Sequence, residues 1–167
     1  MKFETTRFGQ VEVKSEDIVI FPDGLLGFPD CTRYTLIDED RAAPFRMLQS
    51  LENPALAFVV IDPLVVRQDY HFNVTKEDLE QIKTDTTENL QVLSIVTMSR
   101  DIRDVTVNLQ GPLVVNPESK LGHQFVLIET DYTTKELLIQ NKDEAVQPQA
   151  QGKSVKEEEK ILQKKAV

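Results

Sequence analysis

The sequence of 167 residues is poor in cysteine, glycine and basic residues, and each shortage excludes a class of protein. A single cysteine, Cys31, cannot form an internal disulfide, which agrees with a reducing compartment. The six glycines are scattered, so the sequence has no phosphate-cradling loop and no dinucleotide fingerprint. Lys and Arg number 19 against 28 Asp and Glu. This balance argues against direct binding of nucleic acid, because affinity for phosphates comes mostly from Lys and Arg.

Long apolar runs are also missing. The longest, such as residues 55–61, stop far short of the ~20 residues that cross a bilayer, so we expect no membrane span and no membrane partner. The first seven residues alternate polar and apolar side chains and contain no apolar core of a signal peptide. We therefore expect a cytoplasmic protein.

The charge is unevenly distributed along the chain. Residues 1–140 hold 13 Lys and Arg against 23 Asp and Glu, a net charge of −10, whereas residues 141–167 have a net charge of +1. From residue 141 onward the aromatic residues disappear and the composition becomes too polar to offset the entropy cost of ordering a packed segment. The sequence predicts one domain over 1–140 and a flexible polar tail over 141–167, in which a frayed helix is the alternative.

Within residues 1–140 the dominant hydrophobic period is two, and short segments are separated by Gly, Pro, Asn and Asp, as in antiparallel sheets. An opening hairpin is predicted, with Gly9 in its turn. Further strands are predicted over residues 17–21, 33–38, 45–51, 56–61, 69–74, 90–98, 104–110, 113–115, 124–129 and 137–139.

One helix is predicted, from a Thr75 cap to about Lys83, with acidic residues in its first turn. So many strands without a long helical crossover favour a closed sheet that hides its edges. The predicted fold is all-β: a small antiparallel β-barrel-like domain with one short helix and a flexible C-terminal tail.

The sequence contains no recognisable catalytic constellation. His71 and His123 are isolated from Cys31, so a zinc site is not expected, and the sequence around Cys31 favours a small side chain at a strand edge over a catalytic nucleophile. The acidic run 38–40 has two interpretations, a cation site or carboxylate pair, or a solvated loop with an acidic interaction surface, and its spacing favours the loop. We expect a binding protein, not an enzyme, with no cofactor and no metal.

Two features predict how such a protein binds. The acidic domain suits a partner with a basic face, because complementary potentials steer encounter. The apolar turn 24–28 forms either a binding lip or a plug folded over the end of the barrel. An exposed sheet edge offers a third mode, in which a partner peptide adds a strand.

Four motifs, in this order, resemble those of the FliW family of flagellar assembly factors, and the resemblance covers about residues 1–140. They are Phe21-Pro22-Asp23-Gly24-Leu25-Leu26-Gly27-Phe28, residues 48–58 (LQSLENPALAF), Asp62-Pro63 and residues 107–117 (VNLQGPLVVNP).

The resemblance implies a small cytoplasmic β-barrel-like protein that binds flagellin and the RNA-binding translational regulator CsrA. Free of flagellin, such a protein antagonises CsrA and so couples flagellin synthesis to export. The alternative is a dedicated flagellin chaperone without a regulatory partner. The candidate contacts for CsrA are acidic: Asp38, Glu39, Asp40, Glu52, Asp62, Asp101, Asp104 and Glu118. The candidate contacts for flagellin are apolar: Leu25, Leu26 and Phe28.

Overall fold

The computed structural model describes residues 1–140, so the predicted tail lies outside the described residues. Eleven strands and two short α-helices occur within this range. The strands are β1 (Lys2–Thr5), β2 (Gly9–Glu12), β3 (Ile18–Ile20), β4 (Arg33–Ile37), β5 (Arg46–Ser50), β6 (Ala57–Ile61), β7 (Gln91–Thr97), β8 (Thr106–Val107), β9 (Leu113–Asn116), β10 (Leu121–Gln124) and β11 (Glu136–Leu137). The helices are α1 (Pro63–Val66) and α2 (Lys76–Gln81).

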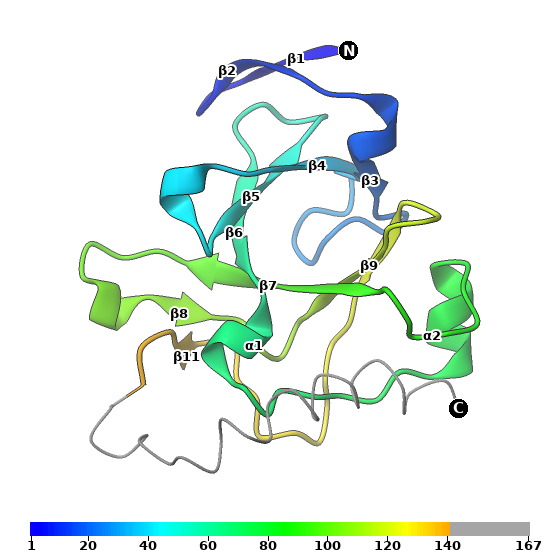
Figure 1. The fold of residues 1–167 in the computed structure, drawn as a ribbon, viewed down its shortest axis with the longest axis vertical. Coiled ribbons are helices and arrows are strands. Elements are labelled where there is room, and N and C mark those ends of the chain that lie inside the picture. The colour runs from blue at the N-terminus through cyan, green and yellow to red at the C-terminus, as the bar shows by residue number, and fades with distance from the viewer. Residues whose placement is uncertain (141–167) are drawn as a thin grey trace.

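Seven strands close into a barrel in the order β7-β6-β5-β4-β3-β10-β9, and β9 pairs back onto β7. Figure 1 shows this ring. Closure depends on β7, which pairs with β9 over Gln91–Leu93 and with β8 over Val96–Thr97. The predicted all-β barrel is confirmed, with one difference: β3 and β10 are parallel, joined at Ile20 and Leu121.

The first two strands form a separate two-stranded sheet outside the barrel (Figure 1). The predicted hairpin is therefore present, with Gly9 at a φ of 65°. The Thr6 amide donates to the carbonyl oxygen of Pro54 at 2.9 Å, which ties the hairpin tip to the β5–β6 connection.

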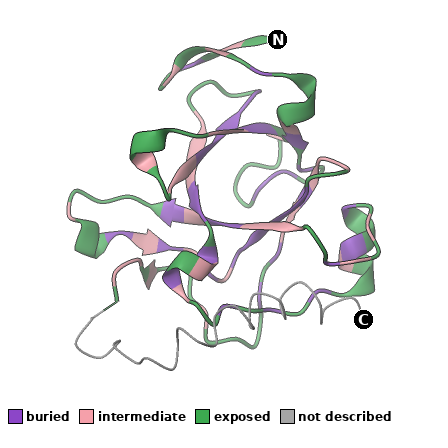
Figure 2. Cartoon of the chain, in the orientation of Figure 1, coloured by how far each residue is buried: buried purple, intermediate pink, exposed green. Residues whose placement is uncertain are grey.

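Two hydrophobic clusters fill the molecule. One is inside the barrel and includes Phe21, Tyr34 and Leu48. The other lies outside the barrel, against β7 and β9. It includes Tyr70 and Leu79, which follow β6 in the chain, and Phe125, which follows β10. Figure 2 shows the buried residues following the ring of strands. The second cluster holds α2 and the C-terminal part of the described chain against the barrel.

The helix at Thr75 is confirmed. Thr75 Oγ1 accepts from the Asp78 amide at 3.1 Å while the Asp78 carboxylate accepts from the Thr75 amide at 2.9 Å, a reciprocal capping box. The short helix α1 is not expected from the sequence. It begins after Asp62, whose carboxylate accepts from the Leu64 amide at 2.9 Å, with Pro63 in its first turn.

Three predicted strands are wrong in whole or in part. Residues 69–74 pair with no strand, because their partners are loop groups: the His71 amide donates to the Tyr132 hydroxyl at 3.0 Å. Of the strand predicted over 104–110 only β8 is present, and of the strand predicted over 124–129 only Gln124 belongs to a strand, β10. Within residues 1–140, no helix is long and apolar enough to cross a membrane.

Candidate functional site

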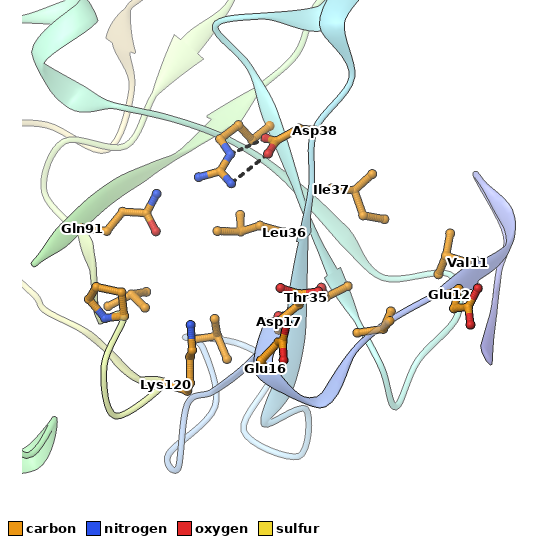
Figure 3. A pocket seen from close by; sticks show the side chains of 15 residues that line it. Val11, Glu12, Glu16, Asp17, Thr35, Leu36, Ile37, Asp38, Gln91 and Lys120 are labelled. Atoms are coloured by element: carbon orange, nitrogen blue, oxygen red, sulfur yellow. Dashed lines mark hydrogen bonds and ion pairs between the residues drawn. The ribbon is translucent and has the colours of Figure 1, made fainter. Parts of the chain in front are cut away.

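A groove opens at the end of the barrel where β3, β7 and β10 begin and β4 ends, beside strand β2 (Figure 3). Its volume is about 590 Å³, and apolar side chains such as Val13, Val19 and Val115 line it together with charged ones. Four of its lining residues are acidic and two are basic. The acidic residues are Glu12, Glu16, Asp17 and Asp38, and the basic ones are Arg46 and Lys120.

One acid of the groove is neutralised within the molecule. The Arg46 guanidinium donates two hydrogen bonds to the Asp38 carboxylate, from Nε to Oδ1 and from Nη2 to Oδ2, the second at 3.1 Å. Such a bidentate pair fixes both side chains. Three acidic residues of the lining remain, Glu12, Glu16 and Asp17, against one basic residue, Lys120. The groove therefore keeps an excess of negative charge.

A second cavity, of about 620 Å³, adjoins the first, because Arg46, Gln91 and Pro117 line both. Its lining is more apolar and includes Leu64 and Leu90. The two cavities form one surface with an acidic half and an apolar half, which we call the bipartite groove. Such a surface suits a polypeptide that carries basic residues beside apolar ones.

The structure brings some of the predicted acidic contacts to this groove. Asp38 lines the acidic half and Asp62 lines the apolar half. Glu118 directly follows Pro117, which lines both halves. Glu39 and Asp40 are exposed beside Asp38, at the start of a 3₁₀ turn.

The other predicted acids lie elsewhere, and two of them have structural tasks. Glu52 accepts hydrogen bonds from the Thr32 and Arg33 amides at 2.9 and 3.1 Å, which ties the start of β4 to the end of β5. Burial raises the pKa of Glu52, but hydrogen bonds from Arg33 and Thr32 outweigh it, so the pKa is lowered. Asp101 caps the 3₁₀ turn 102–104 by accepting from the Arg103 amide at 2.9 Å, and Asp104 is exposed in that turn.

The predicted apolar contacts separate into buried and exposed residues. Leu25 is only 2% exposed and belongs to the barrel cluster, so it plugs the barrel and is not offered at the surface. Leu26 is 64% exposed and Phe28 is 37% exposed, with the Phe28 ring edge-on to Phe58 at a centroid distance of 5.4 Å. The turn therefore plugs the barrel with Leu25 and leaves Leu26 and Phe28 as an exposed lip, whose binding role stays a prediction.

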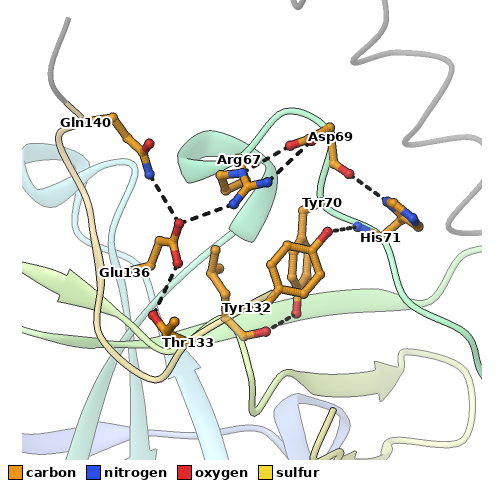
Figure 4. A network of polar contacts seen from close by, with 9 residues as sticks. Arg67, Asp69, Tyr70, His71, Tyr132, Thr133, Glu136 and Gln140 are labelled. Atoms are coloured by element: carbon orange, nitrogen blue, oxygen red, sulfur yellow. Dashed lines mark hydrogen bonds and ion pairs between the residues drawn. The ribbon is translucent and has the colours of Figure 1, made fainter. Parts of the chain in front are cut away.

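A polar cluster on another side of the barrel holds the end of the described chain (Figure 4). The Arg67 guanidinium contacts Asp69 and Glu136, each at 3.2 Å, and lies over the Tyr132 ring at 5.4 Å from its centroid. The hydrogen bond from Arg67 lowers the pKa of Asp69 against the opposing effect of burial. Tyr70 donates its hydroxyl to the Leu109 carbonyl oxygen at 2.7 Å, and burial raises its pKa. Because each group is satisfied by a neighbour, we interpret this cluster as a structural clasp.

Sequence reasoning missed Glu12, Glu16 and Asp17. Their signal was local, since three acids within six residues flank the start of β3, but their proximity to Asp38 and Lys120 arises only from the fold. Among residues 1–140, no three side chains of His, Cys, Asp or Glu are grouped to hold a metal ion.

Comparisons with known proteins agree on one family. The family model described as FliW protein matches residues 2–138. The chain is 44% identical over 136 residues to the flagellar assembly factor FliW of Natranaerobius thermophilus, covering 81% of this chain and 90% of that protein. It is 40% identical over 153 residues to the protein of that name from Geobacter sulfurreducens, covering 92% and 94%. A crystal structure of the flagellar assembly factor FliW superposes with a TM-score of 0.79 at 34% identity, covering 85% of this chain and 99% of that one.

Proposed function

Because the chain belongs to the FliW family of flagellar assembly factors, it has a role in flagellar assembly, and we propose that it acts in the cytoplasm by binding flagellin and antagonising CsrA. Flagellin would occupy the protein until export removes it. The freed protein would then bind CsrA and relieve repression of flagellin synthesis. In this scheme it acts by binding alone and catalyses no reaction.

The observation that carries the proposal is the acidic half of the bipartite groove. A regulator that binds RNA needs Lys and Arg for the phosphates, so CsrA must present a basic face. Glu12, Glu16 and Asp17 offer that face negative charge beside apolar side chains, where partial exclusion of water strengthens charge pairing. The same charge repels RNA, so the protein competes for CsrA without binding its ligand.

The test is to titrate the purified protein into a preformed complex of CsrA with flagellin leader RNA and to follow RNA release by anisotropy, with and without excess flagellin. We expect RNA release that flagellin prevents. If RNA stays bound while flagellin still binds this protein, the regulatory half of the proposal is wrong and the flagellin chaperone is the better account.

A matched pair of charge reversals locates the CsrA contact. Glu16→Lys with Asp17→Lys reverses two acids of the groove, and Glu80→Lys with Asp85→Lys reverses two exposed acids outside it that are not candidate contacts. Both variants change the net charge by the same amount, so an effect of net charge alone would lower the CsrA affinity of both variants equally. We expect the groove variant to weaken CsrA binding roughly tenfold or more and the control about twofold or less. Equal losses would show that net charge, not the groove, governs binding.

A further inference from the structure

The chain remains extended after β10 and continues along the edge of the sheet. The Phe125 amide donates to the Pro112 carbonyl oxygen at 2.9 Å, and the Leu127 amide donates to that of Gln110 at 2.8 Å. Both side chains are buried, each 8% exposed. The edge of this segment that faces residues 110–112, which we call its inner edge, is therefore hydrogen-bonded, and the Phe125 and Leu127 side chains are packed in the core.

The outer edge of the same segment is open. Backbone groups of an extended chain alternate in direction, so the amides of Val126 and Ile128 point away from the inner edge. Within residues 1–140, neither amide donates a hydrogen bond to another group. Their side chains are 55% and 75% exposed, in alternation with the buried Phe125 and Leu127.

Leu26 of the β3–β4 turn extends this apolar edge. Its amide donates to Gln124 Oε1 at 2.8 Å, and Gln124 Nε2 donates to the Gly111 carbonyl oxygen at 3.1 Å, so the lip is fastened to the end of β10. Gln124, Val126 and Ile128 share one face because side chains alternate with a period of two. We call the set of Leu26, Val126 and Ile128, with the open amides, the edge strip.

We propose that the edge strip binds flagellin by strand addition, in which an extended flagellin segment bonds to the open backbone groups of Val126 and Ile128. This inference rests on the proposed partnership with flagellin and assigns it a surface apart from the bipartite groove. Apolar side chains at alternate positions of the added segment contact Leu26, Val126 and Ile128. An open edge with exposed apolar side chains is a liability that a dedicated partner removes.

The charges around the strip favour this occupant over a second copy of the chain. Glu129 and Asp131 are exposed just beyond Ile128, and residues 121–134 contain no Lys or Arg. Two copies would bring these acids together, each on a domain with a net charge of −10. The added flagellin segment should therefore have Lys or Arg beside its apolar residues. A subunit awaiting assembly is a suitable source, because its apolar assembly contacts are still uncovered.

The decisive measurement is amide hydrogen exchange of the full chain by NMR, alone and with flagellin. Free protein should protect the Phe125 and Leu127 amides and leave those of Val126 and Ile128 to exchange rapidly. Flagellin should slow exchange at Val126 and Ile128 about tenfold or more. If flagellin binds and these two amides still exchange rapidly, the edge strip is the wrong surface while the proposed function stands.

A second measurement compares variants. Val126→Thr with Ile128→Thr keeps β-branched side chains but places hydroxyls in the contact, and we expect flagellin binding to weaken roughly tenfold. Val65→Thr with Ile102→Thr is the control, since Val65 is also 55% exposed and Ile102 is 47% exposed, and neither belongs to the strip. We expect the control to bind flagellin, and both variants to bind CsrA, within about twofold of the unmodified protein.

Three other outcomes would overturn the inference. Protection of Val126 and Ile128 that rises with protein concentration alone would show that a second copy occupies the edge. Protection by CsrA and not by flagellin would assign the edge to the other partner. A complete absence of flagellin binding to the unmodified protein would contradict the proposed function itself, and the inference with it.

Discussion

Gly24 and Gly27 lie three residues apart in the turn that plugs the barrel, and both have a positive φ, 67° and 88°. Only Gly24 is enclosed: a Cβ there would lie 2.4 Å from the Phe28 carbonyl oxygen and 2.7 Å from the Pro29 Cα, whereas a Cβ on Gly27 meets nothing within 4 Å. The turn therefore depends on one glycine for space and on both for backbone conformation.

We expect Gly24→Ala to lower the free energy of unfolding by at least about 2 kcal/mol, since backbone strain and a backbone clash combine. Gly27→Ala is the matched control and should cost only about 1 kcal/mol, for the backbone strain alone. Urea denaturation followed by circular dichroism measures both. Equal losses would mean that the close contact at Gly24 relaxes without cost.

Glu52 predicts a pH dependence of stability. Its folded-state pKa is lowered, so its carboxylate stabilises the fold fully above the ordinary value of 4.5, and this contribution disappears as the pH falls through the lowered folded pKa. Glu52→Gln should therefore lower the free energy of unfolding by about 1 kcal/mol at pH 7. The difference from the unmodified protein should shrink as the pH falls below 4.5.

Denaturation series at several pH values test this expectation. Glu118→Gln is the control, because Glu118 is exposed, and it should track the unmodified protein at every pH. A Glu52→Gln deficit that stays constant down to acid pH would contradict the role given to the carboxylate charge.

At the scale of elements, the sequence predicts best where one local interaction decides the structure. The helix at Thr75 was predictable because its capping box needs only residues three apart. Residues 69–74 show the limit. Tyr70, Phe72 and Val74 are buried at alternate positions, as in a strand, but no strand lies beside them, since periodicity reports burial and not pairing. The burial of Leu25 could not be predicted from the local sequence either, because it depends on the closed barrel, which distant strands form.

The clasp around Arg67 gives a prediction for the last described element. The Glu136 side chain is 16% exposed and accepts hydrogen bonds from Arg67 at 3.2 Å and Thr133 at 3.2 Å, which holds β11 against β8. We expect Glu136→Gln to speed amide exchange over residues 132–138 several-fold, with a loss of about 1 kcal/mol or less in global stability. Exchange that is unchanged there would show that the apolar contacts of this segment suffice.

At the scale of the whole molecule, charge predicts how CsrA binding responds to salt. Raising ionic strength from about 0.05 to 0.5 M shortens the Debye length several-fold, so an association steered by a domain of net charge −10 should weaken. We expect a clear loss of CsrA affinity by isothermal titration and a smaller loss of flagellin affinity, because backbone bonds and apolar contacts at the edge strip are less sensitive to salt than charge pairs. A CsrA affinity independent of salt would mean that apolar contacts dominate.

The composition predicts the excess of acidic residues, but it does not predict that several of them gather in one groove. The acidic half of the groove combines residues 12–17 with Asp38 and Lys120, which are separated by up to about a hundred positions, and only ring closure brings them together. The parallel β3–β10 contact that helps to close the ring was likewise beyond prediction, since period-two patterns do not specify strand direction.

The pairing of β3 with β10 also sets an order of events while the chain is synthesised. β3 ends at Ile20 and its neighbour β10 begins at Leu121, so a growing chain makes β3 long before the strand that completes its pairing. At about 5–20 residues per second, the ribosome needs roughly 5–20 seconds to span the interval. A truncated translation product that ends before β10 has an open ring, and the edge strip ends at Ile128, so translation must proceed past residue 128 before the bipartite groove and the edge strip can both exist.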